Sequence, residues 1–200
     1  MSDLALTPVT EIAVGITTAL VAAWNAIRAR HGEVPEAVIT MATGGRESAV
    51  KLAHFSKNRW QAVKGGQTHH EVFVTAESLK GGAVAAMETL VHEAAHGLNV
   101  ARGVDDCSAS QYHNKAFKAA AIELGMTPKI SVSAYDKKKY GFAFMVLGEE
   151  AMEAYADRIA VLDEAIQATR VPAFVPLGPR GCPECHGSQS WRQAMVTMAL

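Results

Sequence analysis

The segment from Met87 to Leu98 constrains this chain more than any other, because it contains the pattern His-Glu-x-x-His. The polar members of the pattern are His92, Glu93 and His96. Histidines four residues apart on a helix lie one above the other, so this pair can bind one metal ion from a single face. Glu93 then lies beside that face, where a carboxylate suits a general base better than a third ligand. The segment therefore predicts a metal-binding helix.

The residues around the motif form two stripes at helical spacing, one apolar and one mostly polar. The apolar stripe predicts the side that faces the core and contains Leu90, Val91, Ala94 and Leu98. The other stripe predicts the side that faces a site and contains Ala85, Glu88, His92, His96 and Asn99. Glu88 is either a partner of His92 or a solvated carboxylate.

Length and composition describe one globular domain with an appendage. The chain has 200 residues, of which 49% are apolar and 20% charged, and its net charge is −1, so no nucleic acid or membrane partner is indicated. The uncharged run from Ile12 to Ile27 is too short to span a bilayer and lacks the basic residues that begin a signal peptide. Three cysteines form no disulfide framework, which favours a reducing cytoplasm.

Hydrophobic periodicity and turn residues predict the elements up to the end of the metal helix. We expect a helix from Thr7 or Thr10 to Arg30, strands at Glu36–Thr40, Leu52–Val63 and His70–Thr75, a turn at Thr43–Arg46, and the metal helix from Gly81-Gly82 to Arg102-Gly103. The strand from Leu52 is expected to break near Ser56.

The remaining elements follow from the same signals. We expect a helix that starts between Ser108 and Gln111 and ends at Gly125, a hairpin of Ile130–Tyr135 with Tyr140–Leu147, and a core-packing helix at Glu149–Thr169. Prolines from Pro172 onward indicate a linker.

A catalytic zinc ion commonly has three protein ligands, so the two histidines leave one ligand to find. Asn99 and Arg102 stand where a metzincin extension would need glycine and histidine. The downstream candidates are His113, Glu123, Asp105 and Asp106. We favour His113, because it falls on the inward stripe at a predicted helix N-terminus, where the dipole favours the neutral, metal-binding imidazole.

The motif and the segment from Tyr112 to Lys118 together resemble the SprT-like zinc metallopeptidases, in which a downstream histidine precedes an aromatic residue by four positions. The resemblance covers about residues 22–125. It implies His113 as third ligand and Phe117 as the packing aromatic, although Asn114 stands where family members often have glycine. It also implies an α+β, minimal zincin-type metallopeptidase fold with a small sheet, a metal-binding helix and an edge strand beside the cleft. The segment His70–Thr75 could provide that edge.

On this basis we expect a metallopeptidase domain at residues 1–147, a C-terminal packing helix at 148–170 and a tail at 171–200. One catalytic Zn²⁺ would be bound by His92, His96 and His113, and Glu93 would activate water for attack on a protein or peptide substrate. The residue that stabilises the oxyanion stays open among Tyr112, Tyr140, His69 and His70.

Two further expectations concern partners and the alternative function. The family's link to DNA repair suggests DNA-associated substrates, but Lys137–Lys139 is the only dense basic cluster and gives this weak support. The alternative to a peptidase is a non-proteolytic regulatory or interaction protein that keeps the metal site.

The tail carries a Cys-x-x-Cys pair at Cys182 and Cys185. A structural zinc site needs four ligands, and only His186 and the distant Cys107 are available to complete this one. We therefore expect a degenerate zinc ribbon rather than a second zinc site.

Overall fold

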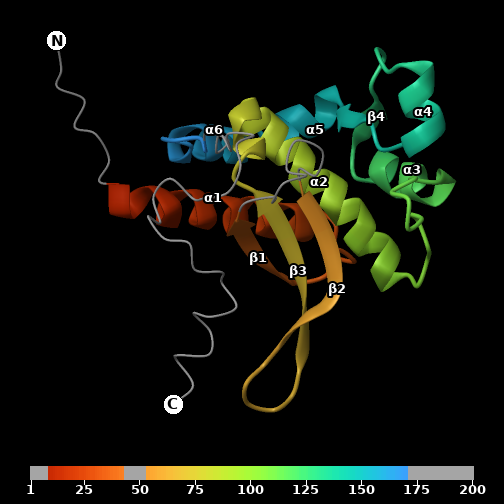
Figure 1. Cartoon of the computed structure of the whole chain (residues 1–200). Helices are drawn as coiled ribbons and strands as arrows, with labels where there is room; N and C mark the ends of the chain where they lie inside the picture. The colour runs from red at the N-terminus through yellow and green to blue at the C-terminus, as the bar shows by residue number, and fades with distance from the viewer. Residues whose placement is uncertain (1–8, 43–52, 171–200) are drawn as a thin grey trace, which may run out of the picture.

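The computed structural model describes residues 9–42 and 53–170, which form a three-stranded sheet, a two-stranded sheet and the helices packed on them (Figure 1). This is the α+β class that the sequence predicts. In chain order the elements are α1 (Val9–Arg30), β1 (Ala37–Ala42), β2 (Ala53–Gln61), β3 (Thr68–Thr75), the 3₁₀ helix η2 (Ser78–Gly81), α2 (Gly82–Ala101), α3 (Lys115–Glu123), β4 (Met126–Pro128), α4 (Ala134–Tyr140), β5 (Met145–Leu147), α5 (Glu149–Ala154) and α6 (Ala156–Ala165). The Thr43–Arg46 turn and the Cys182–Cys185 pair lie outside the described residues.

The larger sheet has the strand order β1-β3-β2, with β3 parallel to β1 and antiparallel to β2. The expectation that His70–Thr75 provides an edge is therefore wrong, because β3 pairs on both sides. Alternation alone cannot distinguish an edge strand from a central one. The edge that lies toward α2 is β2, and the β2–β3 hairpin projects beyond the body of the molecule (Figure 1).

The predicted break in β2 is a bulge. The pairing register shifts between Ser56, opposite Glu71, and Trp60, opposite His69, so β2 contains two more residues than the facing stretch of β3. Asn58 lies in this bulge with a φ of 52°. Its backbone N–H donates to Nδ1 of His70 at 3.1 Å, which holds the bulge against β3.

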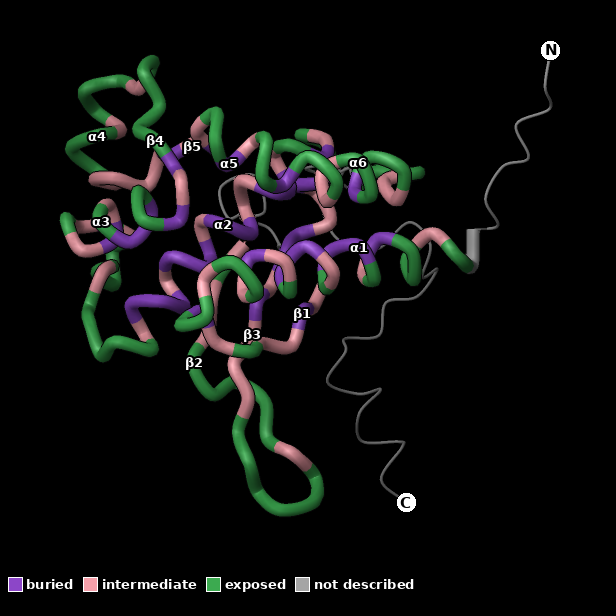
Figure 2. Tube along the Cα trace, turned by 180° about the vertical axis from the view of Figure 1, so that it is seen from behind, coloured by how far each residue is buried: buried purple, intermediate pink, exposed green. Residues whose placement is uncertain are grey.

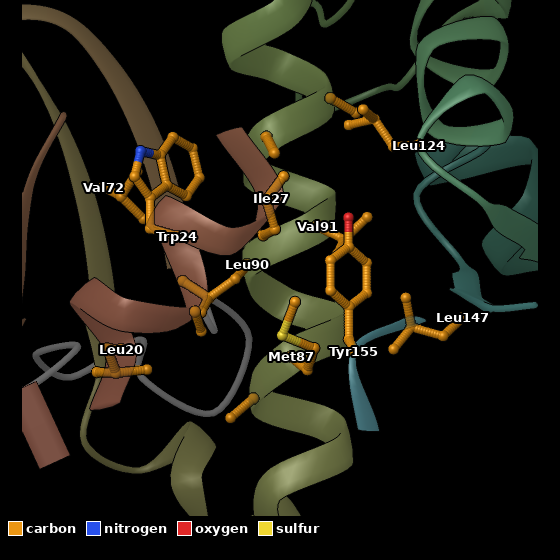
Figure 3. Packing of buried hydrophobic residues seen from close by; sticks show 14 of the residues in the cluster. Leu20, Trp24, Ile27, Val72, Met87, Leu90, Val91, Leu124, Leu147 and Tyr155 are labelled. Carbon is orange, nitrogen blue, oxygen red and sulfur yellow. The ribbon is translucent and has the colours of Figure 1, made fainter. Parts of the chain in front are cut away.

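Helix α2 runs through the middle of the core (Figure 3). Figure 3 shows Leu20, Trp24 and Ile27 of α1 on one side of α2, and Leu147 and Tyr155 on the other. Many residues of α2 and of the neighbouring helix α1 are buried, as the purple segments in Figure 2 show. Helix α1 is long and apolar enough to meet the length and composition test for a membrane span, but its apolar stripe packs against α2, α6 and β1. A buried core helix meets the same test.

Two expectations for residues 108–147 are corrected. The helix expected from Ser108–Gln111 begins at Lys115, because the side chain of Asn114 caps it. The predicted hairpin is absent from the described residues: 134–140 forms α4, capped by Ser133, and β5 pairs with β4 instead. The cap is local, since Oγ of Ser133 accepts the N–H of Asp136 and donates to its carboxylate.

The predicted helix at Glu149–Thr169 is two helices, α5 and α6, separated at Tyr155. Tyr155, Leu162 and Ala151 are buried, so this segment does pack on the core as expected. Its partners are α1 and α2. Helices α5 and α6 cover the core on the side of α2 that lies away from the larger sheet (Figure 1).

Gly97 sets the distance between α2 and β2. A Cβ atom at this position would lie 3.1 Å from Cε2 of Phe55 and 3.2 Å from Cδ of Pro35. Contacts this short leave no room for a larger side chain in a close-packed interior. The absence of a side chain at Gly97 therefore lets the metal-motif helix lie directly against the edge strand.

We predict that Gly97→Val lowers the free energy of unfolding by about 1–3 kcal/mol, because the new methyl groups overpack the α2–β2 contact. Gly15→Val is the matched control, since Gly15 is also helical but a Cβ atom there would meet nothing within 4 Å. Urea denaturation of the two variants measures the difference. Equal losses at both positions would contradict the importance of the contact.

Candidate metal centre

The two histidines of the motif project from the same side of α2 toward a third. Nε2 of His113 lies 3.2 Å from Nε2 of His92 and 3.2 Å from Nε2 of His96. One nitrogen from each ring falls within a cluster whose members are all within 4.8 Å of one another, so the three side chains could hold a metal ion. Zinc–nitrogen bonds of about 2.0–2.1 Å in a tetrahedral site would place ligand nitrogens about 3.3–3.4 Å apart. The observed spacing is close to that requirement.

His113 reaches this position from a loop and not from the first turn of a helix, which corrects the sequence expectation. Its backbone N–H donates to the carbonyl of Tyr140 at 3.0 Å, and its own carbonyl accepts the N–H of Phe142 at 3.0 Å. On its other side it forms a bridge with Cys107. Backbone pairing with two distant segments, rather than a helix dipole, therefore fixes the position of this histidine.

Asn114 follows His113 and caps α3. Its side-chain oxygen accepts the backbone N–H groups of Ala116 and Phe117, and its amide donates to the carbonyl of Asp105 at 2.9 Å. An asparagine therefore has a structural role at the position where SprT-like proteins often have glycine. The neighbouring His113 lies within the cluster.

Phe117 packs against all three imidazoles. It is fully buried, and its ring centroid lies 4.6 Å from that of His92, 4.7 Å from that of His96 and 4.5 Å from that of His113. This matches the packing role that the family resemblance implies for the aromatic residue. One apolar ring thus limits the movement of three rings that come from two separate segments.

In His96 and His113 the Nδ1 atom is the outer nitrogen and the Nε2 atom the inner one, which lies within the cluster. The hydrogen bonds of the Nδ1 atoms determine whether the Nε2 atoms present a lone pair. Nδ1 of His113 faces the carbonyl of Gln111 at 3.0 Å, and Nδ1 of His96 faces the carboxylate of Asp106 at 2.9 Å. Both partners are acceptors, so each Nδ1 must carry the proton, and each Nε2 of a neutral ring then presents a lone pair. These two lone pairs face each other at 3.2 Å, which a bound cation would stabilise. The donor set therefore fits a metal ion.

Burial and neighbouring charges set the protonation of the three rings. Desolvation, with the charge of His96 as a smaller cause, lowers the pKa of His92 well below its ordinary value and the pKa of His113 to about 4. Burial also acts to lower the pKa of His96, but the hydrogen bond that its Nδ1–H donates to Asp106 and the charge of Glu93 raise it overall. Two of the three rings are thus neutral near pH 7, the form that binds metal.

Asp106 positions His96 and is not itself one of the converging groups. Its Oδ2 atom accepts the proton on Nδ1 of His96 and also accepts the side-chain amide of Asn99 at 2.9 Å. Carboxylates in this position orient a metal-binding imidazole and increase its basicity. Sequence reasoning weighed Asp106 as a ligand, because spacing alone does not distinguish a ligand from its partner.

Glu123, another candidate ligand, lies elsewhere. It pairs through both carboxylate oxygens with Arg102, at 2.7 Å and 2.8 Å, and Arg102 also contacts Glu33. Asp105 is exposed and contributes its backbone carbonyl to Asn114. The structure therefore brings together the three histidines and leaves the carboxylate candidates outside the cluster.

Glu93 is buried beside the histidines. Burial is the largest influence on its carboxyl group and raises the pKa to about 7, against the lowering effects of His96 and of a hydrogen bond from the backbone N–H of Phe55. Its Oε2 atom has no hydrogen-bond partner among the described residues. A buried polar atom without a partner is costly in a structural role and is typical of functional sites. The contact with Phe55 in β2 joins a strand to a helix, and no sequence signal predicts it.

Other residues that the sequence suggested for the site make different contacts. Glu88 is half-buried and accepts the N–H of Leu147 at 3.1 Å, so it is neither solvated nor seen to contact His92. His70 accepts the Asn58 N–H, and His69 lines a pocket with Trp24 on the α1 side of the sheet. Tyr140 supplies its carbonyl to His113. The oxyanion candidates His69, His70 and Tyr140 thus have other contacts, of which only the Tyr140 carbonyl reaches a residue of the cluster.

Comparison of the chain with protein-family models, with curated proteins and with solved structures found no match.

We predict that His113→Ala sharply lowers the zinc content of the purified protein, because it removes one of three converging nitrogens. His69→Ala, which removes a histidine outside the cluster, should leave the zinc content unchanged. Metal analysis after dialysis measures both. Full zinc retention in His113→Ala, with loss in Glu123→Gln, would move the third ligand to the carboxylate.

Asp106→Ala should weaken zinc affinity about 10–100-fold, because His96 loses the group that fixes its tautomer and orientation. Asp105→Ala changes the neighbouring, exposed carboxylate and is the matched control. Competition with a chromogenic zinc chelator gives both affinities. Equal affinities in the two variants would exclude the positioning role.

Proposed function

We propose that this chain is a zinc-dependent peptidase with a minimal zincin-type arrangement, in which His92, His96 and His113 hold the ion and Glu93 is the general base. The observation that carries the proposal is the juxtaposition of three converging Nε2 atoms with a buried carboxylate oxygen that lacks a partner among the described residues. Three imidazoles suit zinc and leave a fourth position open. When bound, the ion would act as a Lewis acid toward a peptide carbonyl and toward water.

Glu93 has the properties that proton transfer requires. Its Oε2 atom is free to accept a proton from the attacking water, and the raised pKa of its carboxyl group lies near neutral pH. A base with such a pKa can take a proton in one step and deliver it to the leaving amine in the next. The N–H of Phe55 holds the carboxylate and orients its free oxygen.

Strand β2 is suited to hold the substrate. Among the described strands it pairs with β3 alone, and its residue Phe55 contacts Glu93, so this edge strand borders the proposed site. An extended peptide can add to such an edge by main-chain hydrogen bonds. The substrate class we propose is therefore an unfolded or extended segment of protein. The resemblance to SprT-like metallopeptidases supports the same function and suggests DNA-associated proteins as substrates.

We predict that Glu93→Gln retains zinc but reduces casein hydrolysis by at least about 100-fold, because the amide cannot accept the proton. Glu88→Gln is the matched control on the same helix: the amide oxygen still accepts the Leu147 N–H, so activity should persist. Hydrolysis is measured on the zinc-loaded protein with and without single-stranded DNA.

Two outcomes would contradict the proposal. Equal turnover by the wild-type and Glu93→Gln proteins would remove Glu93 as the base. A zinc-loaded wild-type protein that leaves casein and a panel of unfolded proteins intact would favour a non-proteolytic regulatory protein.

A further inference from the structure

The two edges of the larger sheet differ in how they are protected. Edge strand β2 has three features that keep a strand from pairing with another chain: a bulge, the exposed cations Lys57 and Arg59, and a Phe55 N–H that is already bonded to Glu93. Strand β1, at the opposite edge, has none of the three. Its sequence Ala-Val-Ile-Thr-Met-Ala contains no charge and no proline, and its register with β3 is unbroken. Strand β1 is therefore the edge that can accept a further strand.

The outward edge of β1 has backbone groups without a partner strand. Among the described strands β1 pairs with β3 alone (Figure 1), and within the described residues the backbone of 37–41 forms no hydrogen bond outside the sheet. Helix α1 runs alongside β1 without closing over it. One hollow lies between Trp24 of α1 and Val38 of β1, and a second lies between Ile16 of α1 and Met41 of β1. The edge is thus open toward another chain.

Helix α1, next to this edge, has an exposed stripe without charge. Residues 12–27 include no charged side chain, and only 33% of the most apolar stretch of the helix is buried inside the molecule. Figure 2 shows exposed segments alternating with buried ones along α1. The stripe consists of the exposed residues Val14, Thr18, Val21 and Asn25, of which Val14 is 66% exposed. These residues recur at intervals of four, three and four, the spacing by which one helix packs along another.

A second copy of the chain can cover the open edge and the stripe at the same time. A two-fold axis perpendicular to the larger sheet, placed beside β1, pairs β1 with the β1 strand of the second copy in the antiparallel direction. The same rotation keeps both α1 helices on one face of the joined sheet and brings them next to each other. A partner of another kind would have to supply both a strand and an uncharged helix face, whereas the second copy presents both.

The stripe on α1 is less suited to a lipid surface. It is narrow and includes the polar side chains of Thr18 and Asn25. Helices that lie on membranes have a wide apolar face and lysine or arginine beside it, and residues 12–27 contain neither lysine nor arginine. A protein surface of the same character is therefore the better match.

We propose that the chain forms a homodimer in which the two β1 strands pair antiparallel and the two α1 helices pack through Val14, Thr18, Val21 and Asn25. The joined sheet has the strand order β2-β3-β1-β1-β3-β2. Helix α2, which carries two of the metal-cluster histidines, contacts β2 at the edge away from β1. The two metal clusters therefore lie toward the outer ends of the joined sheet, and the dimer does not depend on the proposed peptidase activity.

The test is sedimentation equilibrium of the full chain over a series of concentrations, with a reducing agent so that the cysteines cannot cross-link. We expect the mass to rise with concentration from 21.3 kDa toward twice that value. Val14→Lys/Val21→Lys places like charges opposite each other across the axis and should raise the dissociation constant at least about 10-fold. Val63→Lys/Ile130→Lys is the matched control: it adds the same charge at two fully exposed positions outside α1 and should dimerise as the parent chain does.

Hydrogen exchange distinguishes strand pairing from helix pairing. The amides of residues 37–42 should exchange more slowly in the parent dimer than in the monomeric α1 variant, because antiparallel pairing gives hydrogen-bond partners to the N–H groups that face away from β3. The exposed end of the β2–β3 hairpin, residues 62–67, is the internal reference and should exchange equally in both proteins. Equal exchange of residues 37–42 in the two proteins would contradict the strand pairing.

A mass of 21.3 kDa for the parent chain at every concentration would overturn the proposal, as would a dimer that the α1 variant retains or that the control variant loses. Binding of a monomeric parent chain to phosphatidylcholine vesicles, lost in the α1 variant, would assign the stripe to a lipid surface instead. Circular dichroism checks the fold of the α1 variant. Should that variant be misfolded, the single exposed change Val14→Glu must raise the dissociation constant, and an unchanged value would contradict the helix contact.

Discussion

Imidazole lone pairs that face one another inside a protein need a positive charge between them, and the arrangement of this molecule depends on that constraint. The outer nitrogens of His96 and His113 are committed as donors to Asp106 and Gln111, which leaves their inner nitrogens as acceptors 3.2 Å apart. A proton could link one pair of rings, whereas a metal ion can satisfy His92 as well. Because burial keeps His92 and His113 neutral, the cluster is preorganised for a cation before any cation binds.

The rest of the fold serves to hold these rings and Glu93 in place. The apolar side of α2 is packed between the sheet with α1 and the elements that follow α3, so the motif helix cannot rotate without opening the core. Gly97 allows close contact with Phe55, whose N–H holds Glu93. His113 depends on backbone pairing with segments on both sides of it in sequence. The site is therefore assembled by tertiary contacts around one helix.

The sequence predicted the parts that depend on local pattern. It placed α1, β1, β3 and α2 within a few residues and identified a break in β2, because periodicity and turn residues determine these features. It also predicted that His113 lies close to the two histidines of α2. That prediction assumed that His113 is at the start of a helix, whereas the cap at Asn114 places the start of α3 after His113. It failed at Ser133, where a local cap makes a helix of a predicted hairpin, and at β3, whose central position depends on pairing between distant strands. Asp106 and Phe55 act through tertiary contacts that spacing does not encode.

We propose that three histidines share one zinc ion, and X-ray absorption at the zinc edge of the protein loaded with one equivalent tests this most directly. The account predicts that the atoms bonded to zinc are nitrogen and oxygen only, at about 2.0–2.1 Å, with the more distant scattering of three imidazole rings. Sulfur neighbours at about 2.3 Å would place the ion at the cysteines of the tail, and scattering from fewer than three imidazoles would contradict the shared site.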